Sequence, residues 1–265
     1  MKFRPCIDIH NGKVKQIVGS SLVDDGDQAR ENFVADQSAA DFARLFRRDN
    51  LTGGHVILLN SRDSDYYEAT RREAMHALAA FPEGLQVGGG ITADNASEYL
   101  EAGASHVIVT SYVFKDGKIA WDHLERLENA VGPEHIVLDL SCKKKPGEDL
   151  YYICTDRWQH FTDTPLDAGL IRELAAHCGE FLVHGISVEG KGSGIDADLV
   201  ALLGEYAGGP NIPPITYAGG IRSWEDIRRI GSLGGSRIDY TVGSALDLFG
   251  GGMEYAKLSR GDVIL

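Results

Sequence analysis

The sequence predicts a (β/α)8 barrel made of two repeated half-barrels, and two observations lead to this fold class. Short β-branched runs alternate with helical patterns along the chain, which is typical of βα units and a parallel sheet. Several landmarks at the ends of predicted strands also recur at about half the length of the 265-residue sequence. We therefore expect a single domain over residues 1–265, with half-barrels at about 1–131 and 132–265.

Eight short apolar runs are the predicted barrel strands, with amphipathic helices between them. The runs are Pro5 to Ile9, His55 to Leu59, Leu85 to Val87, His106 to Thr110, His135 to Asp139, Phe181 to His184, Ile215 to Tyr217 and Asp239 to Val242. The first helix is expected to begin near Asp36, because Phe42 and Phe46 fall on one apolar face. A later helix is expected to begin at Ser223, where Asp226 completes a capping pattern.

Three landmarks recur in the same order in both halves of the chain. Ile7-Asp8-Ile9 recurs as Leu138-Asp139-Leu140, Gly89-Gly90-Ile91 as Gly219-Gly220-Ile221, and Val109-Thr110-Ser111 as Val242-Gly243-Ser244. Such self-similarity at a fixed period indicates a repeated unit. An open doubly wound sheet is the alternative architecture, but it gives no reason for a repeat of half the chain.

The composition of the chain argues against nucleic acid and membranes as partners. The formal net charge is −13 and the longest basic run is Lys143-Lys144-Lys145, so the sequence offers no electrostatic surface for nucleic acid or an anionic membrane. Apolar stretches fall far short of a spanning helix, and the first residues do not resemble a signal peptide. Four cysteines lack zinc-ligand spacing and are expected to be reduced. We expect a cytoplasmic monomer.

Two aspartates are the predicted catalytic residues. Asp8 and Asp139 end the first and fifth predicted strands, which are opposite one another in a ring of eight. Active sites of this fold lie at the carboxyl ends of the strands, so the two carboxylates should face each other across the mouth. One carboxylate can remove a proton while the other donates one to a leaving oxygen. The alternative is that each aspartate merely caps the turn that follows it.

Glycine and hydroxyl residues at four other strand ends predict two phosphate sites. Glycine lets the backbone approach an anion closely, and loops after the seventh and eighth strands commonly bind phosphate in this fold. The repeat predicts a second such site after strands three and four. The predicted residues are Gly89, Gly90, Thr110 and Ser111 for one site, and Gly219, Gly220, Gly243 and Ser244 for the other. Two sites on opposite sides imply a bisphosphate substrate.

Other polar residues are weaker candidates. His55 and His184 flank predicted strands as possible substrate contacts, and Trp158 is either hairpin core or a platform for a planar base. The glycine-rich segment from Val188 to Gly194 is expected to be an active-site loop. The nine histidines show no metal-binding spacing, so neither a metal nor a cofactor is expected.

With these motifs the chain resembles the eukaryotic-type branch of the ProFAR isomerases (phosphoribosylformimino-AICAR ribotide isomerases) of histidine biosynthesis. The resemblance covers essentially the whole chain. It is carried by Cys6 to Gln16, Gln86 to Ile91, Asp139 to Cys142, Val188 to Gly190, Tyr217 to Gly220 and Asp247 to Gly251. It implies an Amadori rearrangement of a bisphosphorylated aminoaldose, with Asp8 as the base and Asp139 as the acid. Gly190 is implied as a further substrate contact.

Two alternatives to an isomerase remain open from the sequence. The cyclase of the same pathway, imidazole glycerol phosphate synthase, shares the repeat, the opposed aspartates and both phosphate sites, so fold-level reasoning does not separate the two enzymes. A non-catalytic barrel that binds sugar phosphates is the other alternative, and the intact pair Asp8 and Asp139 argues against it.

Overall fold

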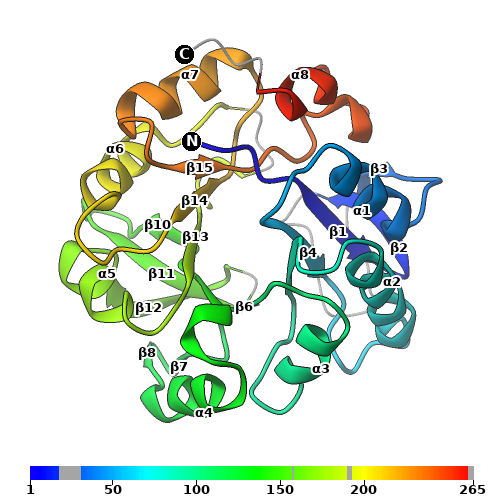
Figure 1. Cartoon of the computed structure of the whole chain (residues 1–265). Helices are drawn as coiled ribbons and strands as arrows, with labels where there is room; N and C mark the ends of the chain where they lie inside the picture. The colour runs from blue at the N-terminus through cyan, green and yellow to red at the C-terminus, as the bar shows by residue number, and fades with distance from the viewer. Residues whose placement is uncertain (18–30, 157, 190–192, 262–265) are drawn as a thin grey trace.

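The computed structural model describes residues 1–17, 31–156, 158–189 and 193–261. Within these residues a helix follows each of the eight barrel strands before the next barrel strand begins or the described chain ends, and Figure 1 shows the helices as an outer ring around the strands. The barrel strands are β1 (Cys6–His10), β4 (Gly54–Leu58), β5 (Leu85–Gly88), β6 (His106–Val109), β9 (Ile136–Asp139), β13 (Glu180–His184), β14 (Ile215–Ala218) and β15 (Asp239–Tyr240). The predicted eight strands are confirmed, with ends that differ by one or two residues.

The helices alternate with these strands in chain order. They are α1 (Ala39–Arg48), α2 (Tyr67–Ala80), α3 (Ala96–Glu101), α4 (Trp121–Val131), α5 (Ala168–Leu174), α6 (Ala197–Tyr206), α7 (Trp224–Leu233) and α8 (Tyr255–Ser259). Helix α1 begins later than predicted because Ser38 caps it, accepting a hydrogen bond from the backbone N–H of Asp41. Ser223 caps α7 in the same way through Asp226, as predicted. No described helix is long and apolar enough to cross a bilayer.

The sheet closes into a ring. Neighbouring barrel strands pair in parallel from β1 through β15. Phe3, just before β1, forms a parallel bridge with Tyr240 of β15, and the backbone N–H of Arg4 donates to the Tyr240 carbonyl at 2.8 Å. The first and last strands are therefore joined, and the (β/α)8 barrel replaces the alternative of an open doubly wound sheet.

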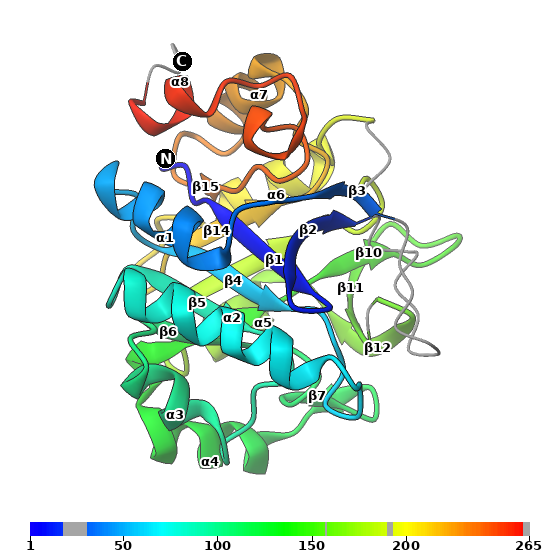
Figure 2. The same cartoon turned by 90° about the vertical axis from the view of Figure 1, so that its right-hand side faces the viewer.

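Antiparallel strands extend the first and fifth βα units, at matching places in the two halves. The first unit carries β2 (Lys13–Ile17) and β3 (Glu31–Val34), and the fifth carries a separate sheet of β10 (Cys142–Lys144), β11 (Tyr151–Thr155) and β12 (His160–Pro165). A small hairpin of β7 (Phe114–Lys115) and β8 (Lys118–Ile119) precedes α4. In Figure 2, β2, β3 and β10–β12 lie on one side of the barrel, beyond the carboxyl ends of the strands.

Alternation along each barrel strand sorts the inward side chains into layers. On β13, Glu180, Leu182 and His184 fall on one face, from the amino end of the strand to its carboxyl end. Leu182 belongs to a small buried apolar cluster with Ile108, Val137 and Ala218. Because this cluster separates Glu180 from His184, the barrel has a polar layer below its apolar centre and another one above it.

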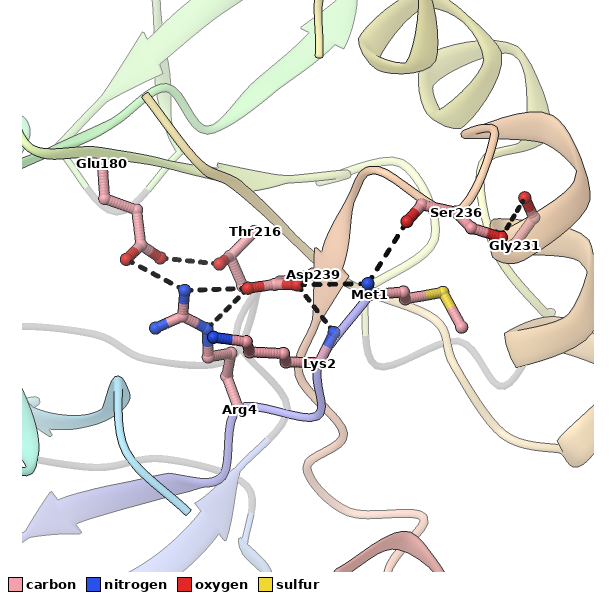
Figure 3. Close-up of polar contacts among 8 residues, drawn as sticks. All are labelled: Met1, Lys2, Arg4, Glu180, Thr216, Gly231, Ser236 and Asp239. Carbon is pink, nitrogen blue, oxygen red and sulfur yellow. Dashed lines mark hydrogen bonds and ion pairs between the residues drawn. The ribbon is translucent and has the colours of Figure 1, made fainter. Parts of the chain in front are cut away.

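The polar layer at the amino ends of the strands is a buried network around Arg4 (Figure 3). The Arg4 guanidinium lies 2.8 Å from Asp239 Oδ2 and 3.4 Å from Glu180 Oε2. Glu180 also accepts hydrogen bonds from Gln86 Nε2 at 2.8 Å and Thr216 Oγ1 at 2.6 Å. Since these residues come from the segment before β1 and from β5, β13, β14 and β15, the network ties the two ends of the ring together.

Candidate active site

A cavity of about 620 Å³ opens at the carboxyl ends of the barrel strands. All of the predicted site residues that the structure describes contribute to its lining. They are Asp8, His55, Gly89, Gly90, Thr110, Ser111, Asp139, Trp158, His184, Gly219, Gly220, Gly243 and Ser244. Gly190 lies outside the described residues, as does part of the loop predicted from Val188 to Gly194. Polar side chains and glycine turns from both halves of the chain therefore meet in one cavity.

Asp139 ends β9 and accepts hydrogen bonds at both carboxylate oxygens. Its Oδ1 accepts from the backbone N–H of Ser141 at 3.0 Å and from Ser141 Oγ at 2.7 Å, and its Oδ2 accepts from Thr110 Oγ1 at 3.0 Å. Burial alone would raise the pKa of Asp139. The neighbouring His184 and these donors overcome burial and lower the pKa below its ordinary value. Asp139 is therefore ionised in the free site.

Asp8 on β1 has a different environment. Among the described residues it accepts one hydrogen bond, from Gln16 Nε2 at 3.2 Å. Burial, reinforced by the negative charge of Glu189, raises the pKa of Asp8 to about 7, against the opposing effects of His184 and Gln16. At neutral pH the Asp8 carboxyl is thus divided between its protonated and ionised forms, whereas Asp139 is ionised.

The pKa values of the two histidines of the site are shifted in opposite directions. His184 Nδ1 lies 3.6 Å from Asp139 Oδ1. Although burial opposes its charge, Asp139 together with Glu189 and Asp8 raises the pKa of His184 above its ordinary value. His55 on β4 is buried, and burial lowers its pKa to about 3. His184 is therefore the more readily protonated imidazole of this site, and His55 is neutral at neutral pH.

The two glycine turns have matching backbone conformations. Gly89 and Gly219 have φ values of 100° and 114°, and Gly90 and Gly220 have φ values of 73° and 71°. Residues other than glycine rarely adopt these positive backbone φ values. A Cβ on Gly89 would lie 2.1 Å from the Leu58 carbonyl oxygen, and one on Gly220 would lie 2.2 Å from the Gly194 carbonyl oxygen. The chain thus forms two equivalent turns at β5 and β14 where the backbone itself faces the cavity.

Replacing Gly89 with alanine is expected to destabilise the protein by about 2 kcal/mol or more, because the Cβ clashes with backbone in a strained conformation. Gly90→Ala is the matched control, since among the described residues its Cβ would meet the Arg62 side chain alone, at 3.8 Å and beyond. Gly90→Ala is expected to destabilise the protein by ~1 kcal/mol, because an alanine is strained at this positive φ. Urea unfolding followed by circular dichroism measures both values, and equal losses would contradict the role given to the Leu58 contact.

The hydroxyl residues of the predicted phosphate sites have several partners. Thr110 donates its hydroxyl to Asp139, and Ser111 Oγ accepts from the backbone N–H of Asp156 at 3.2 Å. Gly243 approaches Gln16, whose Oε1 would lie 2.8 Å from a Cβ at that position. The hydroxyl of Thr110 therefore also orients Asp139, in addition to the phosphate role predicted from the sequence.

Trp158 reaches the cavity from the loop between β11 and β12. It adopts a φ of 67°, which is rare for a tryptophan, and its ring lies 5.8 Å from the His184 ring, centroid to centroid. Lys143 Nζ donates to the Trp158 carbonyl at 3.0 Å and fixes this loop. Trp158 thus lines the cavity beside His184, and its use as a stacking platform stays a prediction.

Among the cavity side chains to which the sequence analysis gave no individual role are Glu189, Gln16 and Arg62. Glu189 faces Asp8 and raises its pKa, Gln16 donates to Asp8, and Arg62 lies beside Gly90. Glu189 lies in the segment that the sequence predicts as an active-site loop, but a glycine-rich loop has no periodicity that would give this side chain a role of its own. Among the residues that the structure describes, no group of three or more histidine, cysteine, aspartate or glutamate side chains is arranged to hold a metal ion.

Comparisons with known proteins show the family of the chain. The family model described as "Histidine biosynthesis protein" matches residues 2–250. The chain is 53% identical over 260 residues to the chloroplastic 1-(5-phosphoribosyl)-5-((5-phosphoribosylamino)methylideneamino)imidazole-4-carboxamide isomerase of Medicago truncatula, covering 96% of this chain and 80% of that protein.

Fungal relatives carry the same isomerase name. The chain is 44% identical to the Yarrowia lipolytica protein over 254 residues, which is 94% of this chain and 93% of that protein. It is 41% identical to the Saccharomyces cerevisiae protein over 254 residues, or 95% and 94% of the two chains. The chain therefore belongs to the histidine biosynthesis family, among relatives that are ProFAR isomerases of plants and fungi.

Proposed function

We propose that this protein catalyses the Amadori rearrangement of ProFAR, N'-(5'-phosphoribosylformimino)-5-aminoimidazole-4-carboxamide ribonucleotide, to its phosphoribulosyl isomer. The observation that carries the proposal is the placing of Asp8 and Asp139 on β1 and β9 in one cavity between two matching glycine turns. The isomerase names of the plant and fungal relatives support the same substrate.

The two aspartates divide the proton transfers of this reaction. Asp139 delivers a proton to the ring oxygen of the aminoribose as the C1–O bond breaks, which gives a Schiff base. Asp8 then removes the proton from C2, and the resulting enolamine tautomerises to the aminoketone. Because these steps need a proton donor and a carboxylate base, acid–base chemistry is sufficient and we propose no metal or cofactor.

The glycine turns bind the two phosphates in this proposal. Gly89 and Gly90 approach one phosphate together with Thr110 and Ser111. Gly219, Gly220, Gly243 and Ser244 approach the other. Backbone donors suit a dianion in a protein of net charge −13, and Arg62 adds a cation beside the first turn. A substrate with two phosphates fits this arrangement better than one with a single phosphate.

Turnover of ProFAR with and without an ammonia source tests this function. We expect the phosphoribulosyl isomer to form at the same rate in both conditions, as followed by chromatography. A parallel assay supplies the phosphoribulosyl ketose itself; imidazole glycerol phosphate formed from it in an ammonia-dependent way would instead assign the cyclase activity. Tight binding of ProFAR without any conversion would assign a non-catalytic barrel.

We also propose that the protein is a cytoplasmic monomer. The four cysteines are free and buried, which suits a reducing compartment, although the Medicago relative is named chloroplastic. The exposed large apolar side chains among the described residues lie on separate elements, such as Val34 on β3, Trp121 on α4 and Leu233 on α7. Light scattering behind a sizing column tests the monomer.

A further inference from the structure

The protonation of Asp139 poses a problem for the proposed mechanism. An acid must hold a proton before it can donate one, yet His184, Ser141 and Thr110 together lower the pKa of Asp139 and so favour its carboxylate. Its Oδ1 accepts from the backbone N–H of Ser141, which is a donor only, and its Oδ2 accepts from Thr110 Oγ1. The proton that reaches the substrate through Asp139 must therefore be held nearby before the reaction.

His184 is the neighbour that can hold this proton. Its side chain is 18% exposed, and its Nδ1 lies 3.6 Å from Asp139 Oδ1, slightly beyond direct hydrogen-bond distance. That nitrogen is buried and makes no hydrogen bond within the described residues. A shift of a few tenths of an ångström would bring it within bonding distance, and the Trp158 ring packs beside the imidazole.

The charged groups that face His184 all favour its cationic form. Asp139 on β9, Asp8 on β1 and Glu189 in the loop after β13 are acidic, and each of them raises the pKa of His184. The titratable group on β4 is His55, which is neutral. An imidazolium beside three carboxyl groups is thus electrostatically stabilised despite its burial.

We propose that His184 is a positioning residue that stores the proton Asp139 delivers to the substrate. The proposal rests on the proposed isomerase function and adds a residue to it. In the free enzyme Asp139 is ionised and His184 is the cation. His184 Nδ1 first transfers its proton to the Asp139 carboxylate, and Asp139 then passes this proton to the ring oxygen as the C1–O bond breaks.

The proton transfers balance over a full turnover. In ring opening the Asp139–His184 pair loses one proton to the ring oxygen, and the nitrogen lone pair forms the C1–N double bond as the C1–O bond breaks. Asp8 takes the C2 proton and returns it to C1 in the tautomerisation. The enol hydroxyl proton goes back to the pair as the C2 carbonyl forms, so the enzyme ends in its starting state.

Nuclear magnetic resonance on the free protein tests where the proton is held. We expect 15N-histidine spectra to show the His184 imidazole protonated above the ordinary midpoint of ~6.5. Asp139→Asn should lower that midpoint by at least about one pH unit, while His55 stays neutral in both proteins as an internal reference. A neutral His184 at pH 6.5, or a midpoint unchanged by Asp139→Asn, would overturn the proposal. This measurement needs no substrate, so it is independent of whether ProFAR is turned over.

Kinetics on His184→Gln test whether the stored proton is used. We expect kcat to fall roughly 10-fold with little change in KM, a smaller loss than the ~10²-fold typical of a positioned acid itself. The alkaline limb of kcat/KM should move to lower pH by about one unit or more, because the proton must then be held on Asp139.

His76→Gln, on the exposed face of α2, is the matched control and should leave kcat and the pH profile unchanged. A His184→Gln enzyme with wild-type kcat and an unmoved alkaline limb would contradict the proposal. Absence of turnover in the wild-type protein would instead refute the proposed function and leave the magnetic resonance result standing.

Discussion

Replacing Asp8 with asparagine is expected to lower kcat for ProFAR by at least ~10²-fold, because the amide keeps the shape of the side chain but cannot accept the C2 proton. Asp139→Asn should cause a loss of similar size, since the ring oxygen then lacks its proton donor. Affinity should change less than turnover, because in the proposed function the phosphates are bound by the glycine turns. Steady-state kinetics with ProFAR measure kcat and KM separately for each variant.

The double variant is the informative comparison for this pair. Since Asp8 and Asp139 act on one reaction coordinate, the kcat of the double Asp→Asn variant should be only a little lower than that of the less active single variant. Asp163→Asn, on β12 and away from the cavity lining, serves as the control and should keep wild-type kinetics. Near-normal turnover by Asp8→Asn would refute its role as the base, and His55 would then be the next candidate.

The acid limb of the wild-type pH profile follows from the same pair. A base must be ionised, and the pKa of Asp8 is raised to about 7 in the free site. Activity as kcat/KM should therefore rise with pH up to about 7, whereas an ordinary aspartate would place this limb near 4. Because the groups interact, the two limbs of the profile belong to the coupled site. A flat profile between pH 5 and 7 would contradict this environment of Asp8.

The barrel could be predicted because its signals are local and repeated. The first strand, predicted as Pro5 to Ile9, runs from Cys6 to His10, and the predicted capping of α7 by Ser223 is observed. The last strand ends at Tyr240, two residues earlier than predicted, because the chain turns toward Gly243, whose carbonyl accepts from the N–H of Leu246 at 3.0 Å. Strand ends depend on such turns, which apolar patterns do not report.

The contacts within the site could not be predicted in the same way. Equivalent positions in the repeat placed Asp8 and Asp139 at the mouth, but their different pKa values come from neighbours on other strands. Thr110 reaches Asp139 from β6 and His184 reaches it from β13, and both contacts depend on the register of the closed sheet. The repeat in the sequence places the two aspartates at equivalent positions. Their different neighbours in the folded barrel make Asp139 ionised and leave Asp8 about half protonated at neutral pH.

Arg4→Met is expected to destabilise the protein by ~3–5 kcal/mol, because it removes the guanidinium that two buried carboxylates share. Only the N-terminal ammonium of Met1, 3.9 Å from Asp239 Oδ1, would remain as a cation among the ion pairs of the described residues. Asp239 would lose its ion pair at 2.8 Å, and Glu180 would lose the contact at 3.4 Å while keeping Gln86 and Thr216. No sequence pattern joins these residues, since Arg4 and Asp239 are 235 positions apart. Urea unfolding at pH 7 measures the loss, with Arg126→Met as the control because its pair with Asp94 is exposed.

The loss on replacing Arg4 should itself depend on pH. Burial already raises the pKa of Glu180 despite the opposing effect of Arg4, and removing that guanidinium raises it further. At pH values between the pKa of Glu180 in the unfolded chain and its raised pKa in the folded variant, the folded state binds more protons than the unfolded state. The stability of the variant therefore falls as the pH rises through this range. The loss of stability caused by Arg4→Met should therefore be smaller at pH 5 than at pH 8. The difference should be about 1.4 kcal/mol for each unit by which the substitution raises the pKa of Glu180 between these two pH values. A deficit equal at both pH values, or no larger than that of Arg126→Met, would show that the guanidinium is not what stabilises these carboxylates.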